Sequence, residues 1–206
     1  MSGEELGKGM SQDSEANFEI REEPVGNLEA YAEIPIAFLV DSVLLPVEPP
    51  QGAIGPRFDE APQEPPYWKD YDADRGNHPT DWPKRFDTSS WVLISAWHES
   101  VRIGGIVGAH GCDGVDMLEG RDDLAVLWDV RVAPEFRRRG VGAALFAVVE
   151  AWAQARGCRS LKVETQNINV GACKFYEGRG FELGGVDPLA YPELPNETQM
   201  LWYKDI

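Results

Sequence analysis

The stretch Leu127-Trp-Asp-Val-Arg-Val-Ala-Pro-Glu-Phe-Arg-Arg-Arg-Gly-Val-Gly-Ala-Ala-Leu145 combines a strand, a turn and the start of a helix. The β-branched run at 126–132 predicts a strand, and Ala133-Pro134 ends it because proline donates no ladder hydrogen bond. The basic, glycine-containing turn at 137–142 then opens an amphipathic segment. Free N–H groups and the positive end of the dipole at a helix start bind phosphate groups. The stretch therefore predicts a phosphate-binding turn between a strand and a helix.

Composition limits the kind of partner that this chain binds. The chain has 206 residues, is 43% hydrophobic and carries a formal net charge of −16. This charge argues against nucleic acid and anionic membranes as main partners and favours a cationic substrate. Neither a transmembrane run nor the apolar core of a signal peptide is present. The three cysteines form no C-x-x-C motif, which is typical of reduced thiols in a cytoplasmic protein.

The chain divides into a short tail and one domain. Residues 1–17 are predicted to be a disordered acidic tail, because few of their side chains are apolar. Residues 18–206 have the length and apolar content of a single domain. Within it, the proline-rich segment 49–83 mixes aromatic and acidic side chains. We expect either a poorly ordered surface insertion or a lid that holds a cation by charge and cation–π contacts.

Hydrophobic periodicity predicts a regular order of elements from Ser90 onward. Strands are expected at 91–97, 102–110, 124–132, 160–165, 181–186 and 199–203. The third is apolar almost throughout, which predicts a central position in a sheet. Helices are expected at 140–156 and 169–179. Upstream, weaker patterns predict strands at 18–25 and 40–47 and a short helical piece at 28–38. This order is typical of an α/β (α+β) protein with a mixed central sheet flanked by helices.

The basic turn does not match two better-known phosphate loops. The chain has no G-x-x-x-x-G-K-[ST] sequence, and Gly140-Val141-Gly142 lacks the third glycine of a dinucleotide-binding loop. What remains is Arg137-x-x-Gly140-x-Gly142. Its glycines let a pyrophosphate approach the backbone, and Arg137, Arg138 and Arg139 would add cationic donors at the rim. A basic helix start that binds no ligand is the alternative.

The context of this turn resembles the acetyl-coenzyme A motif of the GNAT superfamily of N-acetyltransferases. That motif is a strand, V-x-P, and then [RQ]-x-x-G-x-[GA] at a helix start, as in 132–142 here. An asparagine follows the next strand, at Asn167 or Asn169, and 175–181 is similar to the family's F-Y-x-x-x-G-F. The resemblance implies a GNAT fold with a mostly antiparallel mixed sheet, acetyl-CoA as co-substrate, and no metal.

Within that superfamily, residues 127–134 and 164–169 look like those of the streptothricin acetyltransferases. The implied function is transfer of an acetyl group to a primary amine of a cationic small molecule, giving antibiotic resistance. Acetylation of a protein N-terminus, a lysine or a polyamine is an alternative, and so is a non-enzymatic acyl-CoA-sensing module. A homodimer is possible.

The resemblance assigns coenzyme contacts to the strand, the turn, the helix start and two later positions. These residues are Val130, Arg131, Val132, Arg137, Arg138, Arg139, Gly140, Val141, Gly142, Ala143, Asn169 and Tyr176. Val130 and Val132 would bind the pantetheine arm through their main chain, as an added strand. Asn169 is also a favourable helix N-cap, so it has a structural alternative.

Acyl transfer from a thioester to an amine requires removal of a proton from the amine and protonation of the leaving thiolate. The resemblance makes Tyr176 the acid; the alternative is a core tyrosine. Asp129 and Glu164 lie within apolar strands and are candidates for the base or for binding the acceptor's ammonium groups. A structural hydrogen-bonding carboxylate is the alternative for each. The three histidines have no spacing typical of a metal site.

Overall fold

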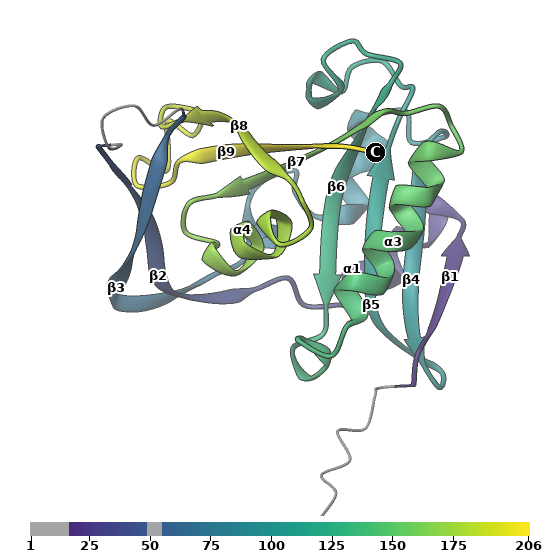
Figure 1. Ribbon diagram of the computed structural model, residues 1–206. Coiled ribbons are helices and arrows are strands. Elements are labelled where there is room, and N and C mark those ends of the chain that lie inside the picture. The colour runs from purple at the N-terminus through teal and green to yellow at the C-terminus, as the bar shows by residue number, and fades with distance from the viewer. Residues whose placement is uncertain (1–16, 49–54) are drawn as a thin grey trace, which may run out of the picture.

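A computed structural model describes residues 17–48 and 55–206 (Figure 1). Apart from Asn17, the predicted disordered tail lies outside these residues. None of the helices in the described ranges has the length and apolar content of a membrane span.

Seven strands form one sheet across the molecule. Their order is β1 (Glu19–Glu23), β4 (Val92–His98), β5 (Val101–Ala109), β6 (Leu124–Val132), β7 (Ser160–Gln166), β9 (Gln199–Asp205) and β8 (Glu182–Asp187). Every neighbouring pair is antiparallel except β6 and β7. This arrangement confirms the expected mixed, mostly antiparallel sheet and the central position of β6.

Helices cover both faces of the sheet. They are α1 (Leu28–Ala32), α2 (Trp82–Arg85), α3 (Val141–Gln154) and α4 (Val170–Glu177). Short 3-10 turns occur at Val25–Asn27, Tyr71–Ala73, Pro79–Asp81, Asp116–Leu118 and Pro134–Phe136. In Figure 1, α3 crosses in front of β4 and β5, whereas α1 lies behind them.

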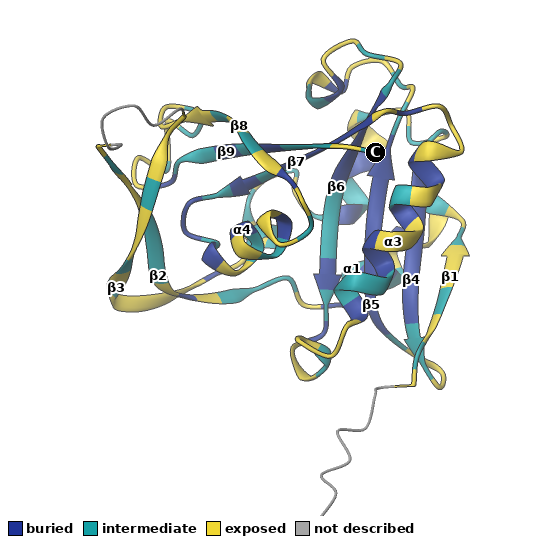
Figure 2. Ribbon diagram, in the orientation of Figure 1, coloured by how far each residue is buried: buried dark blue, intermediate teal, exposed yellow. Residues whose placement is uncertain are grey.

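The sheet separates two apolar cores. The first lies beneath α3 and α4 and includes Leu145, Val149 and Trp152. The second lies beneath α1 and α2 and includes Tyr31 and Trp82. Figure 2 shows the buried strands β4 and β5 between them. The helical spacing of 140–156 is confirmed, although Val148 remains 38% exposed on the outer side of α3.

The expectation of a poorly ordered insertion at 49–83 is wrong for its described part. Residues 57–69 form strand β3 (Arg57–Lys69), which pairs antiparallel with β2 (Phe38–Val47) in a two-stranded ribbon. Proline is tolerated there because β3 pairs with only one neighbour. The segment then continues through short turns to Trp82, which is buried in the second core. Residues 49–54 lie outside the described ranges.

A β-bulge in β6 changes the faces on which its side chains lie. Val107 pairs with Asp129 and Gly108 with Leu127, so Trp128 is the extra residue. Trp128 packs in the second core, and Asp129 contacts Tyr31 on that same face. The bulge therefore directs two consecutive side chains of β6 to the face of the second core, which strict alternation along a strand would not allow.

The edge strand β1 is fastened to the sheet by a shielded ion pair. Arg102 Nη2 lies 2.7 Å from Glu23 Oε2, and Asn27 Nδ2 donates to the same oxygen at 2.9 Å. Although burial opposes its charge, Arg102 and Asn27 hold the pKa of Glu23 at about 2. The carboxylate therefore stabilises the fold fully above its unfolded pKa of about 4.3, and this contribution is lost as the pH falls toward 2.

We expect Glu23→Gln to remove up to ~3 kcal/mol of unfolding free energy at pH 7 and to flatten the fall in stability between pH 4.5 and 2. Urea unfolding at a series of pH values measures both effects. Glu22→Gln, on the exposed side of β1, is the matched control. An identical pH dependence in the two variants would contradict the assignment.

Candidate active site

Strands β6 and β7 separate after a short parallel pairing. Leu124–Leu127 pairs with Ser160–Val163, and beyond that point β6 continues to Val132 and β7 to Gln166 without pairing to each other. Figure 1 shows the two strands running apart. On its other side, Val130–Val132 pairs with β5. The main chain of β6 therefore has one hydrogen-bonding edge without a strand partner, where an extended ligand can add itself.

The basic turn opens α3 with unused backbone donors. Gly140 is the N-cap, with φ at +84°, and Arg138 also has a positive φ, at +63°. No side chain caps the first turn of α3. By contrast, Asn169 Oδ1 accepts a hydrogen bond from the Ala172 N–H at 3.1 Å and caps α4. The N-terminus of α4 is thus satisfied from within the chain, whereas that of α3 can bind an anion.

Small residues keep space at this helix start. A side chain at Gly140 would meet no atom within 4 Å, and a Cβ at Gly142 would meet the Phe175 ring at 3.5 Å. A larger side chain at Gly142 would fill the space between α3 and α4. The open backbone, the two glycines and the exposed Arg138 and Arg139 fit a pyrophosphate group.

The sequence suggested that Arg137 is a cationic donor at the rim of the turn, but its side chain bonds within the protein. Its Nε donates to the Val132 carbonyl at 2.9 Å, and its Nη2 donates to the Ala37 carbonyl at 3.2 Å. Both bonds go to main-chain oxygens on elements before the turn. Arg137 therefore fastens the turn to the end of β6 and to the chain before β2.

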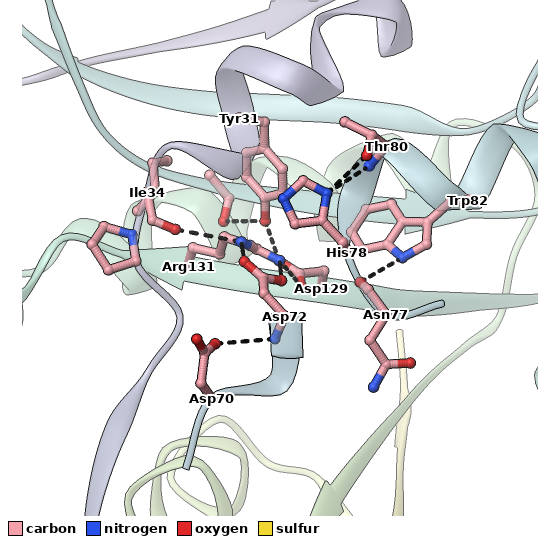
Figure 3. Close-up of polar contacts among 12 residues, drawn as sticks. Tyr31, Ile34, Asp70, Asp72, Asn77, His78, Thr80, Trp82, Asp129 and Arg131 are labelled. Carbon is pink, nitrogen blue, oxygen red and sulfur yellow. Dashed lines mark hydrogen bonds and ion pairs between the residues drawn. The ribbon is translucent and has the colours of Figure 1, made fainter. Parts of the chain in front are cut away.

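The Arg131 side chain is also turned away from the proposed coenzyme edge. It is fully buried and makes paired hydrogen bonds to Asp72 at 2.7 and 2.8 Å and to Asp129 at 2.8 and 3.0 Å. Its guanidinium carbon lies 5.1 Å from the centre of the Tyr31 ring (Figure 3). Burial opposes the charge, but the two carboxylates raise the pKa of Arg131. Only the main chain of Arg131 is left for coenzyme binding.

Asp129 lies in the environment of a structural hydrogen-bonding carboxylate, which was the alternative to a catalytic role. Both of its oxygens accept hydrogen bonds from Arg131, and Oδ1 also accepts one from the Tyr31 hydroxyl. Its side chain is only 8% exposed. This carboxylate stabilises the fold, because without it the buried guanidinium would be short of a partner. Gly105 completes this arrangement, since a Cβ there would lie 2.6 Å from the Tyr31 ring.

The turn Tyr71–Ala73 links the two separated strands. Asp72 binds Arg131 of β6, whereas the Tyr71 hydroxyl donates to Gln166 at the end of β7. Asp70 caps the turn by accepting the Asp72 N–H at 3.1 Å (Figure 3). This part of segment 49–83 thus spans the opening between β6 and β7 on the α1 side.

Tyr176 lies on α4, inside the first core. Its ring packs against Phe175 and Phe181, and the residue is 5% exposed. Burial, together with the charge of Asp129, raises the pKa of the Tyr176 phenol above its ordinary value. The phenol is therefore protonated at neutral pH, as an acid requires.

A cavity of about 390 Å³ lies beside the end of β7. Its lining is Asp74, Arg75, Asn77, Glu164, Gln166, Tyr191, Glu193, Leu194 and Glu197. Glu164 accepts hydrogen bonds from the Tyr191 hydroxyl at 2.5 Å and from Gln199 Nε2 at 2.8 Å. Four of the lining residues are carboxylates, which favours a cationic ligand. Among the described residues, no cluster of three or more ligating side chains could hold a metal ion.

Several residues of this region gave no distinct sequence signal. Asp72 and Asp74 belong to the acidic segment suspected as a lid, but nothing in their spacing indicated Arg131 as a partner. Tyr191 and Glu197 lie in a proline-rich loop before β9 and carried no motif. Only the tertiary arrangement brings this loop and residues 70–77 to the same strand end.

The mixed, mostly antiparallel sheet with helices on both faces and an uncapped helix start after the basic turn is the arrangement expected of a GNAT acetyltransferase. The model of the acetyltransferase (GNAT) family matches residues 56–181. This chain therefore belongs to the GNAT acetyltransferase family.

The similar proteins of known name are mostly antibiotic acetyltransferases. Streptothricin acetyltransferase A of Bacillus subtilis is 40% identical over 81 residues, which are 38% of this chain and 47% of that protein. The chain thus matches about half the length of this relative. The Streptomyces lavendulae streptothricin acetyltransferase is 25% identical over 91% of this chain and 94% of its own length.

Solved structures agree with this fold over nearly the whole chain. A streptothricin acetyltransferase described from Bacillus anthracis, in complex with acetyl coenzyme A, has a TM-score of 0.72 at 27% identity and covers 92% of this chain and all of its own. A nourseothricin acetyltransferase has a TM-score of 0.69 at 24% identity, over 91% of this chain and 98% of its own, which supports the fold alone.

We expect Asp72→Asn to lower the unfolding free energy by about 3 kcal/mol, because a buried guanidinium loses one of its two carboxylates. Equilibrium urea unfolding measures the change. Asp59→Asn is a matched control, since Asp59 is an exposed aspartate of β3 whose nearest cation lies 3.6 Å away. Equal stability of the two variants would show that Asp72 is dispensable to the buried pair.

We expect Gly142→Trp to weaken coenzyme A binding at least 100-fold, because an indole fills the space between α3 and Phe175. Titration calorimetry with coenzyme A measures the affinity, and circular dichroism verifies folding. Gly26→Trp is the control, since Gly26 is exposed and has open space around it. Unchanged affinity in a folded Gly142→Trp variant would exclude this site.

Proposed function

We propose that this chain is an acetyl-CoA-dependent N-acetyltransferase that modifies a primary amine of a cationic small molecule. The observation that carries the proposal is the uncapped start of α3 beside the unpaired edge of β6. Bound acetyl-CoA supplies a thioester for attack by an amine. The first-turn N–H groups of Val141, Gly142 and Ala143 would hold its pyrophosphate, and the main chain of Val130–Val132 would align its arm.

Tyr176 is proposed as the acid that protonates the leaving thiolate. Its phenol is protonated at neutral pH, so it carries the proton that the leaving thiolate needs as the carbon–sulfur bond breaks. Asn169 supports this arrangement by capping α4, the helix that carries Tyr176.

Glu164 is proposed to face the acceptor. It lies on the wall of the acidic cavity, so its carboxylate can attract an ammonium group and accept a proton through water. Asp129 is proposed to act indirectly, by holding Arg131 and the bulged part of β6 in place.

The proposed acceptor is a streptothricin-type antibiotic. Relatives named streptothricin acetyltransferase support this class, and one named aminoglycoside N(6')-acetyltransferase type 1, from Salmonella typhimurium, is 36% identical over 75 residues. Acetylation removes a positive charge from such a drug, which would reduce its activity. We also propose a cytoplasmic location, since Cys112, Cys158 and Cys173 are all free thiols.

A thiol-release assay with acetyl-CoA tests the acceptor. Streptothricin, aminoglycosides, polyamines and peptides are compared at equal concentration. We expect the highest kcat/KM for streptothricin. Turnover with peptides alone would replace the proposal by protein acetylation, and coenzyme binding without turnover of any amine would favour an acyl-CoA-sensing module.

We expect Tyr176→Phe to lower kcat about 100-fold while the KM for acetyl-CoA changes less than twofold. In the unsubstituted enzyme, activity should not fall through ionisation of this phenol below about pH 10, because its pKa lies above the ordinary value. Steady-state kinetics across pH measure both. Tyr203→Phe, a tyrosine of β9 that binds Glu119, is the control. An unaltered kcat in Tyr176→Phe would exclude the acid role.

A further inference from the structure

The acidic cavity contains a carboxylate that the proposed chemistry does not use. Glu197 is 6% exposed and lies on the cavity wall. Its Oε1 pairs with Lys69 Nζ at 3.0 Å. Its Oε2 is buried and has no hydrogen-bond partner. An unsatisfied buried carboxylate oxygen is costly, and an N–H donor from a ligand in the cavity can remove that cost.

The carboxylates around the cavity outnumber the cationic side chains beside them. Four carboxylates line it, and the cations beside them are Arg75 and the buried Lys69, which also pairs with Asp74 at 3.1 Å. Burial opposes the charge of Lys69, but Glu197 and Asp74 raise its pKa, so it stays an ammonium. Formally, the two cations balance two of the four carboxylates, so two negative charges of this group are not neutralised.

The carboxylates are distributed along the cavity. Glu164 comes from β7, in the sheet, whereas Asp74 comes from the segment after β3. Glu193 and Glu197 come from the loop between β8 and β9, and Glu193 is exposed. A volume of about 390 Å³ lies within the usual range for small-ligand pockets. It therefore has room for an acceptor with two separate cationic groups.

We propose that Glu197, Asp74 and Glu193 form a subsite for a second ammonium group of the acceptor, while the amine to be acetylated lies toward Glu164. This inference rests on the proposed function and specifies its substrate class as amines that carry a further positive charge. Lys69 pairs with Glu197 Oε1 and with Asp74 Oδ2, which leaves Asp74 Oδ1 and Glu193 to receive the second ammonium, with the unpaired Glu197 Oε2 behind them.

Matched acceptors test the subsite. Thiol release from acetyl-CoA is followed with 1,5-diaminopentane and with 5-amino-1-pentanol, which have the same length but differ by one ammonium group. We expect kcat/KM to be at least tenfold higher for the diamine. Glu197→Gln and Glu193→Gln should each reduce this ratio at least threefold, and added salt should reduce it further. Glu22→Gln, on β1 at the opposite edge of the sheet, should leave it unchanged.

A second measurement separates the subsite from the reaction. Calorimetry measures 1,5-diaminopentane binding to the coenzyme A complex, in which no transfer takes place. Binding that both substitutions weaken supports the subsite even if no amine is acetylated, which would overturn the proposed function alone. Equal kcat/KM for the two acceptors, or a ratio retained in both variants, overturns the subsite. If Glu197→Gln does not fold, the Glu193→Gln variant still tests the subsite, because Glu193 is exposed.

Discussion

The buried guanidinium of Arg131 is the interaction on which the arrangement of the site depends. A charge in the core requires partners, because water no longer solvates it. Its partners come from separate parts of the chain, with Asp129 on the bulged β6 and Asp72 in the turn after β3. Tyr31 of α1 adds its ring and a hydroxyl contact to Asp129. One buried cation thus holds three segments at the opening between β6 and β7.

That opening leaves main-chain groups of β6 without a partner strand. Within most of the sheet, neighbouring strands satisfy each other's backbone groups, but β6 and β7 stop pairing after Leu127. The start of α3 is likewise left uncapped, whereas Asn169 caps α4. Both departures concern main-chain groups, so the proposed coenzyme contacts are made largely by the backbone. Glycines at 140 and 142 keep this backbone open, and Arg137 bonds to main-chain carbonyls.

The proposed selection of the acceptor, in contrast, rests on side-chain charge. The chain has a formal net charge of −16, and part of that charge is concentrated in one cavity at the end of β7. The segment that contributes Asp72 to the Arg131 pair continues directly into the cavity at Asp74. The same piece of chain therefore braces strand β6 and lines the acidic cavity. A change in this segment is expected to alter both regions together.

The sequence by itself determined the succession of strands and helices from Ser90 onward, since hydrophobic periods and turn residues are local signals. It also located the glycine-containing turn before α3, because 137–142 and the following helix start are contiguous. Only the tertiary structure decided the rest. The pairing of β3 with β2 and the Arg131–Asp72 contact join positions far apart in the chain. The bulge at Trp128, which turns Asp129 toward Tyr31, depends on the register with β5. Such contacts follow from packing and from the need to neutralise buried charge, which no local pattern records.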